Sequence, residues 1–484
     1  MAELLSDHVD VLIVGAGLSG IGAASHLRRR LPEKSLLILE SRDAIGGTWD
    51  LFRYPGIRSD SDMYTLGYAF KPWTHAKAIA DGPSIRDYVR ETATEHGIEK
   101  TIRFGHRVVA ASWSSRDALW TIEAATAEGR ATFTCRFLVL AAGYYDYDEA
   151  FRPRWVGEEK FTGEIVHPQF WPEGLNYCGK TVAVIGSGAT AVTLVPEMAR
   201  SAAHVTMVQR SPSYIVARPS IDFIAEWLKR WLPAKLAYAL VRWKNVLLSS
   251  VFYRLARRRP EKVAAKLIGM VRDEIGPGFE EADFRPAYRP WDQRLCLVPD
   301  GDLFTAVRDG KVTIATGAIE CFTAKGLKLA TGEEVAADIV VAATGLKVVP
   351  LGKVRLSIDG KPADPGQAMV YKGMMLSDVP NMMFIFGYTN ASWTLKADLT
   401  CDYLVRLLKR MNSHGKKVAV ARRDPSVGEI QFLDFTSGYV KRALPALPKQ
   451  GERRPWRLYQ NYWLDLMALR FGAIEDGTMA LERG

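Results

Sequence analysis

The sequence has few cysteines, and none of them are close together. They are Cys135, Cys178, Cys296, Cys321 and Cys401, and the closest two are 25 residues apart. This spacing excludes a paired-cysteine redox motif and a C-x-x-C zinc site, and we expect no bound metal. Because a sparse, odd set of cysteines indicates reduced thiols, we also expect a cytoplasmic protein.

The sequence also lacks a secretory signal and a long apolar run. The N-terminus, MAELLSDHVD, is acidic and has no basic segment in front of an apolar one. Arg242 and Lys244 interrupt the best candidate for a membrane span. We therefore expect neither export through a signal peptide nor a segment that crosses a bilayer.

The charge balance is basic, with a formal net charge of +10. This excess suits a polyanion, an anionic membrane surface or a phosphate-bearing cofactor. Because the basic residues are spread out and no nucleic-acid-binding motif is present, we expect no nucleic-acid partner. The 484 residues, 48% hydrophobic and 24% charged, are typical of a globular protein with two or three domains.

Residues 11–40 have the order strand, glycine turn, helix, strand, acid. The run Val11–Val14 leads into GAGLSG, and the apolar run Leu36–Leu39 ends at Glu40. Such glycines let the backbone approach a pyrophosphate, the helix N-terminus stabilises its charge, and the acid binds a ribose. The pattern predicts a dinucleotide site with contacts from Gly15, Gly17, Ser19, Gly20 and Glu40.

Residues 181–211 repeat this order with one difference. The run Thr181–Ile185 leads into GSGATA, but the next strand ends in Gln209-Arg210-Ser211, without a carboxylate. A carboxylate would repel a 2′-phosphate, whereas a guanidinium can form two hydrogen bonds to it. We therefore expect FAD at the first site and NADPH at the second. The predicted NADPH contacts here are Gly186, Ser187, Gly188, Ala189, Thr190, Arg210 and Ser211.

The stretch Gly46–Asp60, GGTWDLFRYPGIRSD, follows the acid of the first unit. One interpretation is a surface loop rich in turn formers. The other is a loop that covers the isoalloxazine ring of FAD, which its position after Glu40 favours. That interpretation predicts FAD contacts from Gly47, Thr48, Trp49 and Asp60. Val108, in a strand expected over Ile102–Val109, is a further candidate on the adenine side.

The segment Phe223–Ile268 is helical in pattern, basic and aromatic. It mixes Trp227, Trp231 and Trp243 with lysines and arginines. One interpretation is peripheral membrane docking by a basic amphipathic surface. The other is a helical cap that packs its aromatic face on the protein and exposes its lysines. Further on, Thr389–Asp398 resembles a capped helix start, as needed for a helix aimed at the flavin.

These segments predict an α/β protein with two Rossmann-like dinucleotide-binding domains, one for FAD and one for NADPH, and a helical insertion in the NADPH domain. The FAD domain is expected at 1–148 and 349–484, the NADPH domain at 149–215 and 300–348, and the insertion at 216–299.

With these residues established, the chain resembles the type I Baeyer–Villiger monooxygenases, a class of flavoprotein monooxygenases, from Val11 to beyond Trp456. Two signatures carry the resemblance: Phe161-x-Gly163-xxx-His167-xxx-Trp171-Pro172, and Gly46-Gly47-x-Trp49…Tyr54-Pro55-Gly56…Asp60. The tracts PWDQRL and GYTNASWTLKADL resemble the ethionamide-activating group of this family. From the residues alone, 161–171 is equally an interdomain linker, because one histidine without a partner specifies no chemistry.

The resemblance implies that NADPH reduces FAD and that reduced FAD captures O₂ as a C4a-peroxide. The peroxide attacks a small organic ketone to give an ester or lactone, and sulfides and thioamides are also oxidised. The resemblance further implies Arg294 as the catalytic arginine, Asp60 as its partner, and Arg58 and Ser59 as nicotinamide-side contacts. Many members have a lysine where this chain has Gln293, so NADPH preference depends more on Arg210.

Three alternatives stay open on the sequence. The first is a flavin monooxygenase limited to N- and S-oxygenation. The second is a pyridine-nucleotide–disulfide reductase, which needs the paired cysteines that are missing here. The third is a non-catalytic, membrane-associated or redox-sensing flavin-binding protein. The sequence predicts no oligomeric state.

Overall fold

The structure is a computed structural model of the whole chain, in which residues 7–433 and 437–483 are described. Residues 1–6 of the acidic N-terminus, where no signal peptide is expected, lie outside the described residues.

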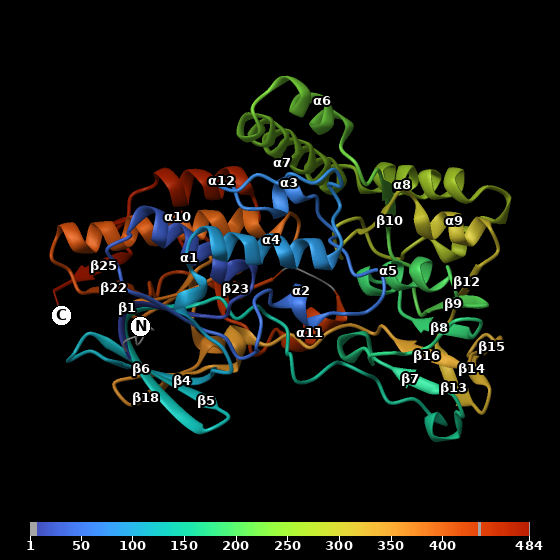
Figure 1. Cartoon of the computed structure of the whole chain (residues 1–484), viewed down its shortest axis with the longest axis horizontal. Helices are drawn as coiled ribbons and strands as arrows, with labels where there is room; N and C mark the ends of the chain where they lie inside the picture. The colour runs from blue at the N-terminus through green and yellow to red at the C-terminus, as the bar shows by residue number, and fades with distance from the viewer. Residues whose placement is uncertain (1–6, 434–436, 484) are drawn as a thin grey trace.

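A nine-stranded sheet forms the centre of the first unit (Figure 1). In the parallel part of this sheet, β1 lies between β2 and β6 and is hydrogen-bonded to both. The parallel strands are β1 (His8–Val14), β2 (Leu36–Leu39), β3 (Ile102–Arg103), β6 (Gly129–Leu140) and β21 (Met382–Phe384). An antiparallel extension consists of β4 (Arg107–Ser114), β5 (Leu119–Thr126), β17 (Arg355–Ile358) and β18 (Lys361–Ala363), with β17 parallel to β4.

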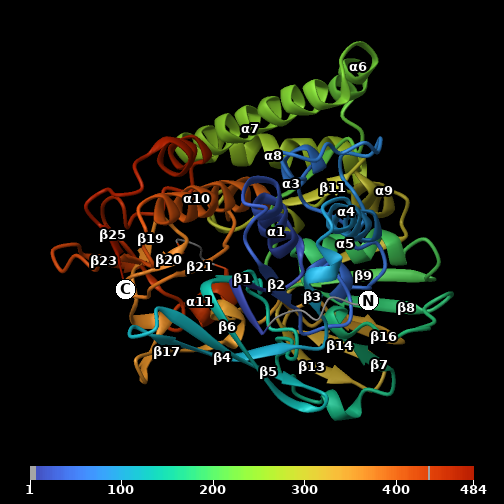
Figure 2. The ribbon, with the colours of Figure 1, turned by 60° about the vertical axis from the view of Figure 1, so that its left-hand side comes forward.

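Alternating side chains of β1 enter two different cores. Val11 and Ile13 pack beneath the helices, whereas Leu12 and Val14 pack on the side of β4 and β5. Successive strand residues point to opposite faces, so a strand that is buried on both faces is apolar throughout. The helices on the first face are α1 (Leu18–Arg30), α4 (Gly82–Glu95) and α10 (Trp393–Ser413), as Figures 1 and 2 show.

The second unit has a five-stranded, fully parallel sheet. In spatial order its strands are β12 (Val312–Thr316), β9 (His204–Gln209), β8 (Thr181–Ile185), β16 (Ile339–Ala342) and β7 (Glu164–Val166). Helices α5 (Ala189–Met198) and α9 (Asp302–Arg308) pack on one face, and a three-stranded antiparallel sheet packs on the other. That smaller sheet is β13 (Ile319–Thr323), β14 (Gly326–Leu329) and β15 (Glu334–Ala336). The predicted α/β architecture with two dinucleotide-binding units is confirmed.

The inserted segment contains α6 (Phe223–Trp231), α7 (Ala234–Arg258) and α8 (Pro260–Ile275). Its two ends are joined by the parallel pair β10 (Ile215–Arg218) and β11 (Cys296–Pro299). Although the segment interrupts the second unit in sequence, α6 and α7 pack on the core of the first through Ala225, Tyr238 and Val241.

The expectation that this segment packs its aromatic face inward is wrong. Trp227, Trp231 and Trp243 are 59%, 74% and 41% exposed. The inner face of α7 instead buries Ala237, Tyr238, Val241, Arg242 and Val246.

Two local expectations are also corrected. The strand expected over Ile102–Val109 is broken into β3 and β4, because Gly105 adopts φ +66° and turns the chain between them. Helix α10 begins at Trp393 without a side-chain cap, because the hydroxyl of Ser392 is hydrogen-bonded to Thr65 instead, at 2.6 Å.

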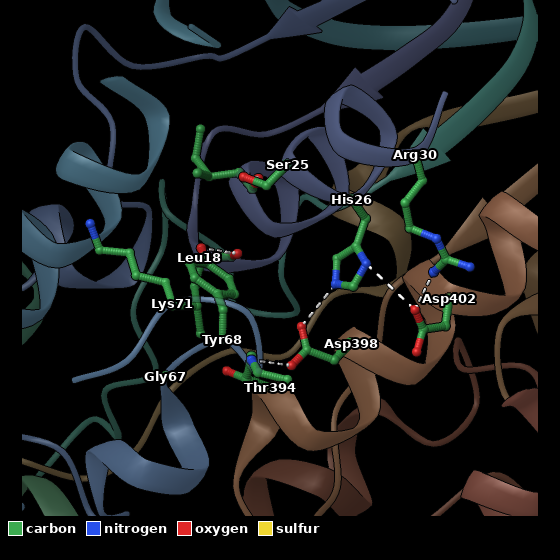
Figure 3. Close-up of polar contacts among 12 residues, drawn as sticks. Leu18, Ser25, His26, Arg30, Gly67, Tyr68, Lys71, Thr394, Asp398 and Asp402 are labelled. Carbon is green, nitrogen blue, oxygen red and sulfur yellow. Dashed lines mark hydrogen bonds and ion pairs between the residues drawn. The ribbon is translucent and has the colours of Figure 1, made fainter. Parts of the chain in front are cut away.

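A buried carboxylate, Asp398 of α10, joins three segments of the first unit and the inserted helix α7. It accepts hydrogen bonds from His26 of α1 at 3.1 Å, from the Ala69 backbone at 2.8 Å, and from Arg242 of α7 at 3.1 Å. Figure 3 shows the His26 ring between Asp398 and Asp402. Because α1 and α10 begin at the same cavity, this cluster fixes both helix N-termini relative to each other.

Asp398→Ala should lower the free energy of unfolding by about 3–5 kcal/mol, because it leaves the buried Arg242 without its counter-charge. Burial alone would raise the pKa of Asp398, but the hydrogen bond from His26 and the charge of Arg242 hold it below its ordinary value. The stabilisation is therefore fully present above about pH 4 and disappears as the pH falls through the lowered pKa.

Denaturant unfolding of the variant and the wild type at pH 7 and pH 3 measures this difference. The matched control is Asp87→Ala on α4, an exposed carboxylate whose ion pair is with its neighbour Arg86. We expect a change within about 0.5 kcal/mol for that control. Equal effects of the two substitutions at pH 7 would contradict the role given to Asp398.

Candidate functional site

The main cavity has a volume of about 330 Å³ and lies between the two units. It collects most of the residues predicted from the sequence. Those that line it are Gly15, Gly17, Ser19, Glu40, Gly47, Thr48, Trp49, Arg58, Ser59, Asp60, Val108, Ala189, Thr190 and Arg294. Six predicted residues do not line it: Gly20, Gly186, Ser187, Gly188, Arg210 and Ser211.

The first glycine turn is shaped for a close approach of backbone to ligand. Gly15 has φ +102°, and a Cβ atom there would lie 2.8 Å from the carbonyl oxygen of Ala141. A Cβ atom on Gly20 would overlap the carbonyl oxygen of Gly15, so Gly20 serves the packing of α1 on the turn rather than the cavity wall. Helix α1 begins at this turn, and its free N–H groups suit a pyrophosphate.

Glu40 lies at the end of β2, buried but in contact with the cavity. Its carboxylate accepts hydrogen bonds from the backbone of Ala16 at 2.6 Å and of Arg42 at 2.9 Å. These bonds fix the carboxylate beside the glycine turn. A carboxylate offers about four acceptor positions, so lone pairs are left for the hydroxyl groups of a ribose.

The loop after Glu40 lies directly on the first glycine turn. The N–H of Gly46 donates to the carbonyl of Ala16 at 3.1 Å, and Gly17 and Gly46 form a parallel β-bridge. Gly47 follows with φ +57° and starts the short helix α2 (Thr48–Leu51). The structure thus favours the cavity-lining interpretation of this loop over that of a surface loop.

Asp60, at the end of the same loop, forms an ion pair with Arg294. The Nη1 and Oδ2 atoms are 3.2 Å apart, and the Arg294 side chain is 35% exposed. The Asp60 carboxylate is the main reason that the pKa of Arg294 is raised above its usual value, against the opposing effect of burial. The guanidinium therefore carries its charge at any pH at which the protein is folded.

Arg294 lies where the main cavity meets a second cavity of about 30 Å³. Aromatic and aliphatic side chains dominate the wall of this small cavity. Its lining consists of Tyr144, Arg294, Val348, Phe386, Tyr388, Thr389, Trp393, Leu433, Tyr439 and Val440. One cationic group in an apolar pocket beside a cofactor-sized cavity is the arrangement expected of a small-molecule site.

Two residues that line both cavities, Tyr144 and Trp393, were not predicted from the sequence. Their rings stack with centroids 5.1 Å apart, and the indole N–H of Trp393 donates to Ser19 at 2.7 Å. Burial raises the pKa of Tyr144 to about 12, so its hydroxyl stays neutral near pH 7. The sequence signal for Tyr144 was the run YYDY, residues 144–147, which follows the buried strand β6.

The second glycine turn lies at an exposed edge outside the cavity. Gly186 has φ +139°, and the hydroxyl of Ser187 donates to the carbonyl of Ser211 at 2.9 Å. This bond holds the turn against the loop that carries Arg210, which is exposed. Within residues 7–433 and 437–483, no carboxylate forms an ion pair with Arg210. Its guanidinium is thus available to a phosphate next to the turn.

Arg58 and Ser59 both line the main cavity, but the Nη atoms of Arg58 and the hydroxyl of Ser59 form hydrogen bonds within the protein. Arg58 forms an ion pair with Asp302 of α9, and so links the loop to the second unit. The hydroxyl of Ser59 donates to the carbonyl of Ser61 at 2.6 Å.

The segment 161–171 acts as a joint between the units. His167 accepts a hydrogen bond from the Gln169 backbone at 3.1 Å, and the Gln169 side chain donates to the carbonyl of Asp146 at 2.7 Å. Phe161 packs beside β13–β15. Neither cavity is lined by His167 or Phe161, so the structure favours the linker interpretation of their position.

Comparison with known proteins agrees with this geometry. The family described as pyridine nucleotide-disulphide oxidoreductase matches residues 12–240. The chain is 53% identical over 475 residues to the FAD-containing monooxygenase EthA of Mycobacterium tuberculosis, an alignment that covers 98% of this chain and 97% of EthA.

Two solved structures have a similar fold. Oxidized steroid monooxygenase bound to NADP gives a TM-score of 0.77 at 22% identity over 99% of this chain and 100% of that chain. Cyclohexanone monooxygenase with bound ε-caprolactone gives a TM-score of 0.74 at 19% identity over 98% and 100%.

Gly20→Ala should weaken FAD binding by at least about tenfold, which corresponds to a loss of about 1.4 kcal/mol of binding free energy. The purified protein should therefore contain less flavin. The added methyl group displaces the Gly15 carbonyl and with it the turn that faces the cavity. Absorbance at the flavin maximum relative to protein measures the effect, and circular dichroism checks the fold. Gly188→Ala is the matched control, because a Cβ atom there meets no atom within 4 Å. Full flavin content in Gly20→Ala would exclude this turn as the FAD site.

Proposed function

Because this chain belongs to the family of FAD-containing monooxygenases, as its identity to EthA shows, we propose that it performs a Baeyer–Villiger oxidation with FAD, NADPH and O₂. One oxygen atom is inserted next to the carbonyl group of a small organic ketone, and the product is an ester or a lactone. Sulfides and thioamides are further proposed substrates. The fold shared with steroid and cyclohexanone monooxygenase supports this proposal.

FAD fits the main cavity through the first glycine turn, Glu40 and the loop Gly47–Trp49. When bound, reduced FAD supplies the activation of O₂. The N-termini of α1 and α10 both begin at this cavity and direct partial positive charge into it. NADPH fits the second turn, where Ala189 and Thr190 reach the same cavity and Arg210 is free to bind a 2′-phosphate.

The observation that carries the proposal is the position of Arg294, which lines both the main cavity and the apolar pocket beside it. In a Baeyer–Villiger reaction negative charge develops on the oxygen atoms between cofactor and ketone. A guanidinium that is already held in place stabilises that charge without further reorganisation. Asp60 orients the guanidinium from the cavity side.

The small cavity beside Arg294 has an aromatic wall. Tyr144, Phe386 and Trp393 pack against one another, with ring centroids 5.1–5.5 Å apart. These rings lie beside the Arg294 guanidinium and shield part of it, so its charge acts more strongly than that of an arginine fully surrounded by solvent.

The alternative functions are distinguished from the proposed one by different observations. The match to the disulphide oxidoreductase family covers dinucleotide-binding sequence, but all five cysteines are free and lie far apart in sequence. A flavin monooxygenase limited to N- and S-oxygenation is tested with one ketone and one sulfide: sulfoxide without any ester would favour that alternative.

Arg294→Ala should leave FAD bound and flavin reduction by NADPH measurable, while ester formation falls by about 100- to 1,000-fold. This is the loss usually seen when one preorganised charge-stabilising group is removed. Anaerobic stopped-flow reduction and chromatographic product analysis measure the two steps separately. Arg289→Ala, an exposed arginine five residues earlier, is the matched control and should retain full activity. Normal ester yield in Arg294→Ala would refute the role of Arg294.

Arg210→Ala should raise the KM for NADPH about 10- to 100-fold, because a hydrogen bond to a charged group contributes about 1.5–3 kcal/mol. The KM for NADH should stay nearly constant, since NADH lacks the 2′-phosphate. Steady-state assays with both nucleotides measure the ratio. Arg200→Ala, an exposed arginine of the same unit, is the control. An equal increase for both nucleotides would mean that Arg210 does not contact the 2′-phosphate.

A further inference from the structure

Helix α7 carries an apolar stripe on its outer face. Leu236, Leu240, Trp243, Leu247, Val251 and Leu255 recur every three or four residues and are each 41–53% exposed. At a rise of about 1.5 Å per residue the stripe is roughly 28 Å long. Scattered apolar side chains on a surface are ordinary, but a continuous stripe of this length indicates a partner.

The neighbouring helices extend the same surface. On α6, Phe223, Trp227 and Trp231 are 59–74% exposed. On the other side of α7, Trp243 stacks on Trp463 of α12 (Tyr462–Leu466), with ring centroids 5.4 Å apart. The helical turn that follows α12 exposes Met467 and Phe471 by 62% and 65%. Figure 1 shows α6, α7 and α12 along one edge of the molecule.

This apolar surface is surrounded by positive charge. Residues 223–258 contain eight lysines and arginines but a single acid, Glu226, which is paired with Lys229. Exposed Lys235 lies at the start of the α7 stripe. Exposed Arg254 and Arg258 continue it after Val251, at spacings of three and four.

The stripe is held in place by the inner face of α7. The guanidinium of Arg242 is buried and donates to the carbonyls of Tyr64 and Gly67, each at 2.8 Å, as well as to Asp398. Arg242 thereby binds the last turn of α3 (Met63–Leu66). The helix is anchored on one side, while its apolar side chains face solvent.

We propose that α6, α7 and the turn after α12 form a docking surface for the anionic phospholipid face of a membrane. A basic amphipathic helix binds in the plane of such a surface, with its apolar side chains among the acyl chains and its lysines and arginines at the phosphates. In the described part of the chain, no helix is long and apolar enough to cross a membrane, so the contact is peripheral.

Charge favours a lipid surface over a second copy of this chain. In a two-fold dimer the same patch meets itself, so exposed Lys235, Arg254 and Arg258 at the ends of the stripe would face basic residues of the second copy. An anionic bilayer complements the apolar stripe and its basic ends together.

The location of the surface also provides a functional reason for membrane docking. Val246, on the inner side of α7, packs against Tyr388, which lines the small cavity beside Arg294. A bilayer on the outer side would therefore be separated from the proposed substrate pocket by α7 and one layer of side chains. Lipophilic substrates are concentrated in such a bilayer.

Flotation of the FAD-loaded protein with vesicles tests the proposal. The probes are vesicles of phosphatidylcholine alone and of phosphatidylcholine with about 30% phosphatidylglycerol, each at 0.1 M and 0.5 M salt. We expect binding to the anionic vesicles at low salt, weaker binding at high salt because the charges are screened, and little binding to neutral vesicles.

Two variants separate the contributions. Lys235→Gln with Arg258→Gln should lower the partition coefficient on anionic vesicles about 30-fold, since each basic residue near the surface contributes about fivefold. Leu247→Glu with Val251→Glu should abolish binding. The matched control is Val156→Glu with Lys325→Glu, which changes an apolar and a basic side chain that are exposed outside this surface. Flavin spectra and melting temperatures confirm that each variant is folded.

Equal binding to neutral and anionic vesicles, or no binding to either, would overturn the proposal. A dimer in analytical ultracentrifugation that Leu247→Glu with Val251→Glu dissociates, without vesicle binding by the wild type, would assign the surface to a second copy. These outcomes do not depend on the proposed oxidation, because flotation does not measure turnover.

Discussion

The buried carboxylate of Asp398 is the constraint on which the arrangement of this molecule depends. A carboxylate without solvent has to be neutralised and hydrogen-bonded by the protein itself. Here its partners come from α1, from the backbone after α3, and from the inserted helix α7. Satisfying one charge therefore determines how α1, α7 and α10 lie relative to one another. Since α1 and α10 begin at the main cavity, the same cluster also sets the geometry of the cavity mouth.

The site combines residues from two parts of the chain that are far apart in sequence. The first glycine turn, Glu40 and the loop after it belong to one continuous stretch of chain, and they form a cavity wall of backbone and buried acid. Arg294 comes from the end of the insertion and is brought to Asp60 by the pair β10–β11. One part of the chain thus supplies the place for a cofactor, and a distant part supplies the charge next to it. The small aromatic cavity beyond Arg294 then limits the size of what can approach that charge.

Helix α7 contacts two environments, the protein interior on one face and the solvent on the other. Its inner face buries Tyr238, Val241 and Arg242, and the charge of Arg242 is neutralised within the protein. Its outer face contains the large apolar side chains and the remaining exposed arginines. Apolar side chains therefore lie on both faces, whereas the apolar stripe of an ordinary surface helix faces only the core. The arginine can be buried because Asp398 provides its counter-charge beneath the helix.

Local sequence determined much of this protein. Strands β2 and β8 begin and end where their apolar runs do, and the glycine turns with their flanking residues were located because their spacing is imposed by contact with a phosphate. Both members of the Arg294–Asp60 pair were also predicted, because the motifs that contain them resemble those of the family. Only the tertiary structure decided which side of α7 is inside, because the helical periodicity of a segment with apolar residues on both faces gives no direction. It also decided that Tyr144 and Trp393 meet beside Arg294 and that Arg58 is occupied by Asp302, since residues from separate segments become neighbours only when the two units pack together.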